Sequence, residues 1–315
     1  MGAFPARKVS SLEGVREEVL RGLRGSPRTL PPTFFHDART AELQVRLSEA
    51  PEYYLLRAEM EILRVHAADI ARLLGPRVSL LELGSAGGAR LRLLLDALDE
   101  PAAYVPIHLS GAQLAEASTA IDEAYPALPI VPVWADFTSI VTMPAVGVGM
   151  RQVAFLPGST LGRFHPAEAA ALLRRLRGLA GPRGAMVLGV DLRKDPLVLH
   201  AAYNDSAGVA AALNLHQLTR LNRELDADFD LTRFRHYAFY EPVTGRVELH
   251  LVSLARQTVT VAGERIGLEQ AETIWTASDY KYGLPQLETV AHAAGFGVTR
   301  IWTDGGEGFA VAVLE

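Results

Sequence analysis

The stretch from Val78 to Leu98, VSLLELGSAGGARLRLLLDAL, is the part of the sequence that best indicates the class of fold. It joins an apolar run to a glycine-rich turn and then to a helical pattern. An apolar run without polar interruptions is typical of a strand buried on both faces of a parallel sheet. Small residues after such a strand let a ligand approach the backbone, and the helix that follows offers free N–H groups at its start.

The alternation of strands and helices continues on both sides of this stretch. Strands that alternate with helices over residues 59–191 predict an α/β fold with a doubly wound parallel sheet. The further strands are expected at 103–109, 129–134, 152–156 and 185–191, and the helices at 56–74, 111–124 and 167–179.

The pattern changes after Asp191. Residues 197–226 have helical spacing, and period-two alternation then predicts antiparallel hairpins joined by EPVTG and VAGE turns. The hairpin strands are expected at 233–240, 246–254 and 257–262, and the chain ends with a helix at 284–295 and strands at 297–302 and 308–314.

The N-terminal part is predicted to be helical at 11–24 and 38–49, with a proline-rich loop at 25–38. The simplest organisation is one α/β domain that is interrupted late by an insertion. We expect the first domain to comprise 59–194 and 281–315. The second, an α+β domain, would comprise 1–58 and 195–280.

The composition excludes several classes of protein. The chain has 315 residues, 49% hydrophobic and 21% charged, with a net charge of −5 and no cysteine. This supports a sizeable core and excludes global disorder, disulfides, thiolate metal sites and cysteine nucleophiles. A mildly acidic chain without a basic run is not expected to bind nucleic acid. No membrane span is expected, and the N-terminus lacks an apolar signal core, so we expect a cytoplasmic protein.

The glycine-rich turn has the pattern E-x-G-x-x-G, with Glu82, Gly84, Ser85 and Gly87 at the end of the predicted strand. A strand-end acid followed by Gly-x-x-Gly is typical of S-adenosylmethionine domains rather than of NAD domains. The alternative is a tight strand-to-helix turn that needs small residues for packing alone.

Two further positions support a cofactor at this edge. Asp136 and Phe137 follow the strand predicted at 129–134, where an acid and a ring suit the amino group and the face of an adenine. Alternatively, they are a helix cap and a core residue. The strand at 103–109 ends at His108, where such domains usually have a carboxylate for the ribose. A histidine offers one nitrogen in place of two oxygens, or has no ligand role.

Longer stretches of the chain resemble the ergothioneine-pathway histidine Nα-methyltransferases, which use S-adenosylmethionine. The resemblance implies a class I methyltransferase domain and a substrate domain built from the N-terminal segment and the insertion. The matching stretches are PEYYLLRAE (51–59), LLELGS (80–85), LLLDAL (93–98), ADF (135–137), AFLPGSTLGRF (154–164), LGVDLRKDP (188–196), AAYNDSAGVAAALN (201–214), LNREL (221–225), KYG (281–283) and WTD (302–304).

On the cofactor side, the resemblance implies roles for Gly84 with Ser85 and for Asp136–Phe137, which match the family. Arg90 stands where the family has a lysine, and His108 stands where it has the ribose-binding aspartate.

The substrate side departs from the family. Arg163 stands where an asparagine holds the substrate α-amine, and a permanent cation would repel an ammonium. Ala277 and Asp279 replace the glutamate and serine that recognise the imidazole, and His36 stands where a tyrosine binds the substrate carboxylate. A site built around polar groups discriminates strongly, so we expect histidine not to bind.

We therefore expect an S-adenosylmethionine-dependent N-methyltransferase that acts on a small amine or amino-acid-derived molecule, not on free histidine. Arg163 would bind an anionic group and Asp279 an amine or guanidine, unless both are solvated loop residues. Tyr54, Tyr203 and Asp279 are the candidate proton acceptors, because the attacking amine must be neutral.

Two other activities remain open at this point. The chain could use the cofactor for aminocarboxypropyl transfer or cyclise it, or it could be a non-catalytic ligand-binding relative. No metal site is expected, because the histidines are scattered and form no H-E-x-x-H pattern. The expected partner is a small-molecule substrate, and the sequence does not indicate an oligomeric state.

Overall fold

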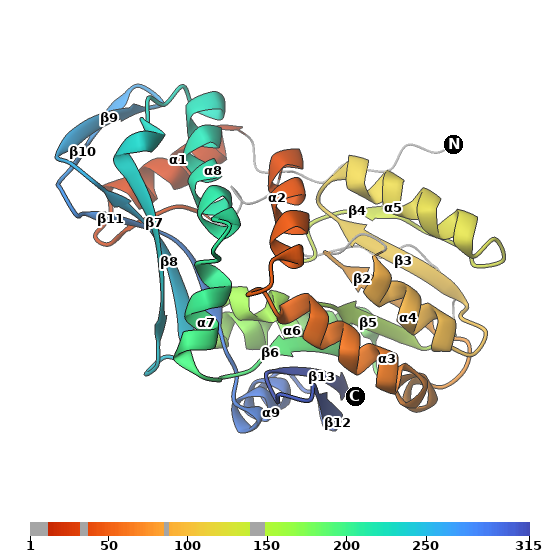
Figure 1. Cartoon of the computed structure of the whole chain (residues 1–315). Coiled ribbons are helices and arrows are strands. Elements are labelled where there is room, and N and C mark those ends of the chain that lie inside the picture. Colours follow the sequence, from red (N-terminus) through yellow and green to blue (C-terminus); the bar gives the residue numbers. More distant parts are fainter. Residues whose placement is uncertain (1–11, 32–36, 85–87, 139–148) are drawn as a thin grey trace. The chain divides into compact units, whose positions relative to one another are not determined.

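The computed structural model describes residues 12–31, 37–84, 88–138 and 149–315 (Figure 1). Contacts within the chain divide these residues into two compact units. Unit 1 contains residues 55–193 and 280–315, and unit 2 contains residues 12–54 and 194–279.

Unit 1 contains a seven-stranded sheet in the order β12-β13-β6-β5-β2-β3-β4. Five strands are parallel, and β13 pairs antiparallel with both of its neighbours. The strands are β2 (Ser79–Leu83), β3 (Ala103–His108), β4 (Val133–Trp134), β5 (Gln152–Leu156), β6 (Ala185–Asp191), β12 (Val298–Thr303) and β13 (Phe309–Leu314). The helices are α3 (Leu55–Leu74), α4 (Ala89–Ala97), α5 (Gly111–Ala124), α6 (Pro166–Ala180), α9 (Leu284–Ala293) and the 3-10 helix η2 (Thr160–Arg163).

Strand order reverses at β2, which is hydrogen-bonded to β3 on one side and to β5 on the other. Residues Ser79 to Leu83 are all buried, as expected for a central strand covered on both faces. In open α/β sheets, ligands bind outside the carboxyl ends of the strands where the order reverses. The predicted doubly wound sheet is confirmed, and its topology points to the end of β2.

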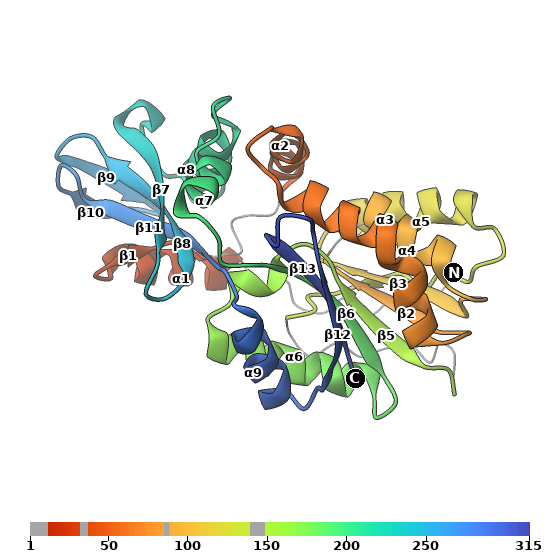
Figure 2. The same cartoon turned by 60° about the horizontal axis from the view of Figure 1, so that its bottom comes forward.

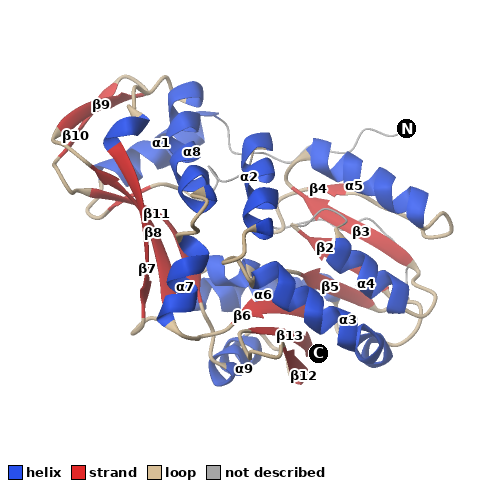
Figure 3. Cartoon of the chain, in the orientation of Figure 1, coloured by secondary structure: helices blue, strands red, loops and turns tan. Residues whose placement is uncertain are grey.

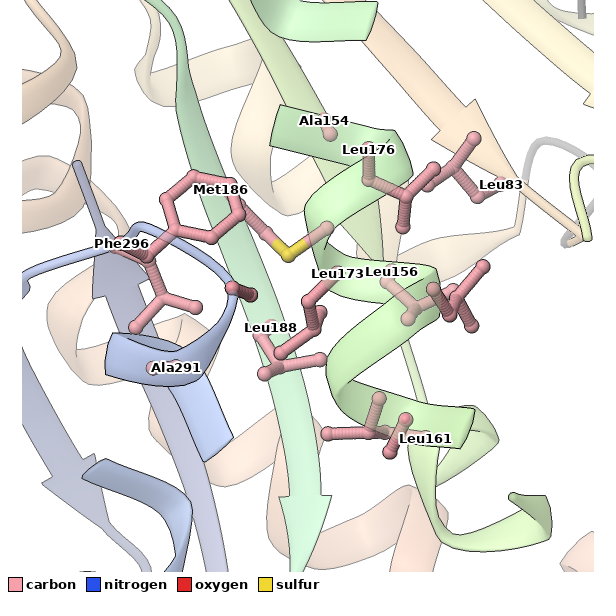
Figure 4. Packing of buried hydrophobic residues seen from close by; sticks show 14 of the residues in the cluster. Leu83, Ala154, Leu156, Leu161, Leu173, Leu176, Met186, Leu188, Ala291 and Phe296 are labelled. Atoms are coloured by element: carbon pink, nitrogen blue, oxygen red, sulfur yellow. The ribbon is translucent and has the colours of Figure 1, made fainter. Parts of the chain in front are cut away.

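Helices cover both faces of this sheet, with α6 and α9 on one face and α3, α4 and α5 on the other (Figure 2). The face under α6 and α9 forms one continuous apolar core, in which Met186 and Leu188 of β6 meet Leu173 and Leu176 of α6 and Phe296 (Figure 4). All five side chains are at most 2% exposed. Close packing of this kind fixes the positions of the carboxyl ends of the strands relative to one another.

Local signals set the ends of α6. His165 and Glu168 form a reciprocal capping box at its N-terminus, and Pro166 occupies the first helical position, where no N–H donor is needed. Gly181, with φ of +76°, ends the helix in a conformation that favours glycine.

A buried ion pair joins the two segments at which the chain leaves and re-enters unit 1. Lys281 Nζ lies 2.7 Å from an Asp191 carboxylate oxygen, and neither side chain is exposed. The backbone adds to this junction, since Tyr282 N–H donates to Asp191 O and Arg193 N–H donates to Tyr282 O, both at 3.0 Å. The insertion therefore begins and ends at adjacent points of unit 1.

Unit 2 combines a four-stranded sheet, in the order β1-β11-β8-β7, with the separate β9–β10 hairpin. The strands are β1 (Arg28–Thr29), β7 (Phe234–Glu241), β8 (Arg246–Ser253), β9 (Gln257–Val261), β10 (Glu264–Leu268) and β11 (Thr273–Tyr280). The helices are α1 (Leu12–Arg24), α2 (Ala38–Glu49), α7 (Pro196–Tyr203), α8 (Val209–Glu224) and the 3-10 helix η3 (Leu231–Arg233).

Three apolar clusters hold unit 2 together. Side chains of α1 and α8 pack against the sheet and the β9–β10 hairpin. Leu43 and Leu47 of α2 pack on the start of α8, and Leu199 and Tyr203 of α7 pack on the β7–β8 hairpin.

The structure departs from the sequence predictions at four places (Figure 3). The strand expected at 129–134 is regular only at Val133–Trp134, with one isolated bridge at Ile130. The expected loop at 25–38 contains β1, which pairs with β11. Residues 257–261 pair with the unpredicted β10. The sequence also gave no indication of β11, because its alternation is masked by polar and small residues near 276–279.

None of the described helices is both long and apolar enough to cross a membrane. In the same described ranges, no group of three or more His, Cys, Asp or Glu side chains is arranged to hold a metal ion.

Removing one partner of the buried junction should cost a large fraction of the stability. We expect Lys281→Met to lower the free energy of unfolding by about 3–5 kcal/mol, because it leaves the Asp191 carboxylate buried without its cation. The double variant Lys281→Met/Asp191→Leu should recover much of that loss. Urea unfolding followed by circular dichroism measures both.

The matched control is Arg72→Met. It breaks the exposed pair of Arg72 with Asp69, whose side chains are 75% and 38% exposed, and should cost less than about 1 kcal/mol. A Lys281→Met loss no larger than this control would contradict the assignment.

Candidate functional site

The backbone at the carboxyl end of β2 is shaped so that only glycine fits at position 84. Gly84 has φ of +70°, which favours glycine, and a Cβ atom there would lie 2.7 Å from the Phe137 ring. Glu82, two residues earlier, points into the core, where its carboxylate accepts a hydrogen bond from Tyr104 at 2.5 Å. The acid of the motif is therefore structural, and Gly84 leaves the backbone accessible.

His108 lies at the end of β3, and its uncharged ring can donate a hydrogen bond. Its Nδ1 accepts the Ser110 N–H at 3.0 Å, which places the ring proton on Nε2. Burial lowers the pKa of His108, so the ring stays uncharged at neutral pH. Nε2 has no hydrogen-bond partner in the part of the chain that the structure describes.

Trp134 is the cross-strand partner of His108, and sequence analysis did not single it out. Its side chain is 51% exposed, and its indole N–H donates to Leu109 O at 2.8 Å. An exposed ring held in place beside a free imidazole N–H is a surface on which a flat base can stack. Its exposure is a property of the folded edge, which the sequence did not indicate.

Asp136 and Phe137 follow β4 at the same edge. Asp136 Oδ1 accepts hydrogen bonds from the N–H of Thr138 at 2.8 Å and from its hydroxyl at 2.6 Å. Phe137 is 8% exposed and belongs to the core under α6 and α9, with its ring against Gly84. The ring shapes the turn at Gly84, and its stacking on adenine stays a prediction.

Arg90 is held by an acid that sequence analysis missed. Its guanidinium donates to the fully buried Glu59 at 2.8 Å, and the Glu59 carboxylate also accepts the Gly158 N–H at 2.8 and 3.0 Å. These bonds tie the start of α4 to the loop after β5. Arg90 therefore organises the edge, whereas its direct contact with a cofactor stays a prediction.

Arg163 ends the 3-10 helix η2, which follows this loop. Backbone of Tyr280 would lie 2.6 Å from a Cβ at Gly162, so η2 packs tightly on the end of β11. The Arg163 side chain is exposed, and its guanidinium has no hydrogen bond or ion pair within the described residues. A free, permanently charged fork at this edge can bind a carboxylate or phosphate.

In unit 2, the structure brings Tyr54 and Tyr203 together. Both belong to one cluster with Leu199, Ala238 and Val247. Lys194 joins them, since its ammonium donates to the Tyr54 hydroxyl at 2.5 Å and lies 4.2 Å from the centre of that ring. Lys194 belongs to the stretch LGVDLRKDP that resembles the family, but the sequence alone indicated no role for it.

Ala277 and Asp279 lie on β11, both half-buried. The Ala277 carbonyl accepts the indole N–H of Trp275 at 2.8 Å, and the Trp275 ring stacks on His250. The carboxylate of Asp279 has no hydrogen bond or ion pair to any described residue. β11 thus presents a methyl group at 277 and a free carboxylate two residues later.

His36 and Ser85 lie outside the described residues. The neighbour of His36, Asp37, caps α2 and receives hydrogen bonds from His216 and Arg223. Burial alone would raise the pKa of Asp37, but these bonds together hold it well below its usual range.

The comparisons with known proteins agree with this arrangement. The model of the histidine-specific, S-adenosylmethionine-dependent methyltransferases matches residues 15–315. The chain belongs to this family. It is 36% identical over 312 residues to a histidine N-alpha-methyltransferase of Mycolicibacterium smegmatis, covering 96% of each chain.

A more distant relative is named for a different substrate. The chain is 25% identical over 328 residues to a 4-dimethylallyltryptophan N-methyltransferase of Claviceps purpurea, covering 96% of this chain and 94% of the relative. Among solved structures, a protein of Bordetella parapertussis described as possibly exported has a TM-score of 0.51 at 13% identity, covering 96% of this chain and 94% of that one, and shows likeness of fold alone. This methyltransferase family member therefore uses S-adenosylmethionine, as the sequence predicted.

The residues at the carboxyl edge of unit 1 fit this cofactor. Gly84 keeps the backbone open where a Cβ would collide with Phe137. His108 offers an N–H donor to a hydroxyl, and Asp136 offers a carboxylate to an amino group. These residues are compatible with S-adenosylmethionine at this edge of the methyltransferase, and the individual contacts, including that of His108 with the ribose, stay predictions.

Substituting Gly84 should abolish much of the cofactor binding. We expect Gly84→Val to weaken S-adenosylhomocysteine binding by more than about tenfold, because a side chain there is strained at φ +70° and displaces Phe137. Isothermal titration calorimetry measures the affinity.

Gly75→Val is the matched control. It places the same side chain on a backbone with φ of +79°, but nothing lies within 4 Å of its Cβ. The prediction fails if Gly84→Val binds the ligand as tightly as Gly75→Val does.

Proposed function

We propose that the chain is an S-adenosylmethionine-dependent N-methyltransferase whose substrate is a small amine or amino-acid derivative other than free histidine. The observation that carries this is the pair of substitutions on β11. Ala277 presents no carboxylate where the family resemblance calls for one, and the carboxylate at Asp279 has no partner in the described structure.

The chemistry at these positions disfavours an imidazole. A carboxylate and a hydroxyl recognise the two ring nitrogens as an acceptor and a donor, whereas a methyl group at 277 offers neither. Loss of this contact leaves a ring nitrogen of histidine without its hydrogen-bond partner in the site, which disfavours histidine. The side chain of the substrate would instead present an apolar surface towards Ala277 and a donor towards Asp279.

Arg163 supports an anionic group elsewhere on the substrate. A guanidinium repels the ammonium of an amino acid but binds its carboxylate through two parallel hydrogen bonds. The Arg163 guanidinium has no hydrogen bond or ion pair to any residue that the structure describes, so all five of its N–H donors are available to a ligand.

When bound, S-adenosylmethionine supplies an activated methyl group. The protein has to position a neutral amine, because the nitrogen lone pair forms the new bond to carbon. The proton of the ammonium must leave for a nearby base. The carboxylate of Asp279 can accept it directly or through water, whereas Tyr54 and Tyr203 can accept it only as tyrosinates or by passing their own hydroxyl proton on to water. Lys194 orients the Tyr54 hydroxyl by donating to it.

The substrate assignment is tested by product mass. The protein is incubated with S-adenosylmethionine and, separately, L-histidine, L-tryptophan, L-tyrosine and their decarboxylated amines. We expect no trimethylhistidine above background and products heavier by 14 mass units, or multiples of 14, from another amine. Efficient trimethylation of histidine would overturn the assignment.

A substitution experiment tests whether Ala277 and Asp279 are what excludes histidine. Restoring the polar pair with Ala277→Glu/Asp279→Ser should raise the histidine kcat/KM at least about tenfold. As a control, Thr258→Glu places a carboxylate on an exposed position of β9 and should leave the kcat/KM for histidine unchanged.

The role of Arg163 has a separate prediction. Arg163→Ala should raise the KM for a carboxylate-bearing substrate by roughly ten- to a hundredfold, since a hydrogen bond to a charged group contributes about 1.5–3 kcal/mol. Arg163→Lys should recover part of this, because the charge remains and the fork is lost.

The control for Arg163 is Arg175→Ala, which removes an exposed guanidinium on α6. Calorimetry with S-adenosylhomocysteine then separates two targets of Arg163. Unchanged affinity assigns it to the substrate, whereas a matching loss assigns it to the cofactor carboxylate. Kinetics and affinity within error of the Arg175→Ala values would show that Arg163 is only solvated.

A further inference from the structure

Asn214 lies at the centre of a buried polar network in unit 2. Its side chain is 1% exposed on α8. The amide oxygen accepts from Gln217 Nε2 at 2.8 Å and lies 2.7 Å from the Thr276 hydroxyl of β11. The amide nitrogen donates to His250 O and contacts His236 Nδ1, both at 3.0 Å. Every hydrogen-bonding position of this amide is therefore used.

The network fixes the state of His236. An amide nitrogen has no lone pair to accept a hydrogen bond, so His236 Nδ1 must be the acceptor and its proton must sit on Nε2. Nε2 lies 2.9 Å from the Tyr203 carbonyl oxygen and donates to it. Burial lowers the pKa of His236, which agrees with a neutral ring.

The bond to Tyr203 is made where the backbone of α7 ends. Tyr203 is the last residue of α7, so its carbonyl lacks a partner within the helix. The next residues fix the turn into α8, because Asn204 donates to Ala238 O and the Asp205 carboxylate accepts the N–H groups of Val209 and Ala210. His236 therefore sets the position of the backbone that carries the Tyr203 ring.

The same amide holds β11 next to its two diverged positions. The Thr276 hydroxyl lies between Asn214 Oδ1 and the carbonyl oxygen of Leu249, at 2.7 and 2.9 Å. Ala277 follows directly in the strand, and Asp279 lies two residues further on. A shift of the amide would thus move both Tyr203 and β11.

We propose that Asn214 and His236 are positioning residues of the methyltransferase, which set Tyr203 relative to Ala277 and Asp279 through an uncharged, one-directional hydrogen-bond chain. The proposal rests on the proposed function, in which Tyr203 and β11 face the substrate. It concerns the reaction through geometry alone, since neither residue contacts the reacting atoms.

The donor-to-acceptor direction of the hydrogen bonds from Asn214 through His236 to Tyr203 provides the test. In Asn214→Asp, a carboxylate can only accept, so His236 must donate through Nδ1 and, to keep Tyr203, also through Nε2. Only the imidazolium does both. The carboxylate of Asp205, whose charge already favours the imidazolium, adds to the new one; the residue opposite His236 on β8 is Leu251, which is uncharged.

Two measurements follow. Nitrogen-detected NMR of the histidine rings should find His236 as the neutral Nε2–H form at pH 7 in the wild type and as imidazolium in Asn214→Asp. The turnover of Asn214→Asp should fall as pH rises through the raised pKa of His236. Wild-type turnover, which needs the neutral ring, should instead be lost as pH falls through the lowered pKa. Activity is followed with whichever amine of the panel above is methylated fastest.

Truncation and rescue complete the test. Asn214→Ala and His236→Ala should each lower kcat about ten- to a hundredfold and leave S-adenosylhomocysteine affinity within twofold. His236→Gln, whose amide can accept from Asn214 and donate to Tyr203, should restore most of the turnover and remove the contribution of this group to the pH profile.

Asn222→Ala is the matched control. Asn222 lies on the same helix and pairs with the Phe229 backbone at 2.8 Å in both directions, without a link to Tyr203. The proposal is overturned if the Asn214 and His236 variants match Asn222→Ala in kcat and KM, or if His236 carries its proton on Nδ1. Failure of the underlying function is distinguishable, because the wild type would then methylate none of the amines of the panel other than histidine.

Discussion

The fold depends on the buried pair between Asp191 and Lys281, where the chain leaves unit 1 and returns to it. A long insertion can be accommodated in a packed domain only if its ends are adjacent, since otherwise the strands on either side would be pulled apart. Here an ion pair of 2.7 Å, with both side chains inaccessible to solvent, and the hydrogen bonds of Tyr282 and Arg193 hold the ends together. A buried charge pair also strongly disfavours any other register, because a slip would leave either charge buried alone.

Two kinds of candidate site residue occur in this structure. At the carboxyl edge of unit 1, backbone shape and a few fixed donors matter most: a glycine that admits no side chain, a neutral imidazole and an exposed indole. In unit 2, side chains are held by buried hydrogen bonds and one ammonium, around two tyrosines and β11. The family membership unites both sets in one activity, methyl transfer from S-adenosylmethionine. The chain departs from the family resemblance on both sides, at Arg90 and His108 in unit 1 and at Ala277 and Asp279 in unit 2, and the roles of these residues stay predictions.

The sequence predicted the bounds of helices and strands closely where the spacing of apolar residues and the residues at the ends of the element indicated the same limits. Residues 111–124, 152–156 and 185–191 were predicted with the bounds that the structure has, because apolar runs and small-residue turns delimit them. It failed at β11 and at β1, whose pairing is between residues 28–29 and 274–275. Such a pairing joins segments far apart in the chain, and no local pattern encodes it. Candidate site residues were found by resemblance, but the partners that fix them, such as Glu59, Lys194 and His236, became visible only as contacts.

By itself, the sequence determined the class of fold, the family and the cofactor, because these depend on the order of buried strands and on short motifs at strand ends. Tertiary structure alone decided which of the polar residues are free. Glu82 belongs to the glycine-rich motif and Arg90 was a cofactor candidate from the family resemblance, and the structure shows their protein partners to be Tyr104 and Glu59. Arg163 and Asp279, which a sequence cannot distinguish from solvated or paired residues, have no partner in the described chain. The physical reason is that a side chain's hydrogen-bond partners are set by segments that meet only after folding, whereas its chemical type is already written in the sequence.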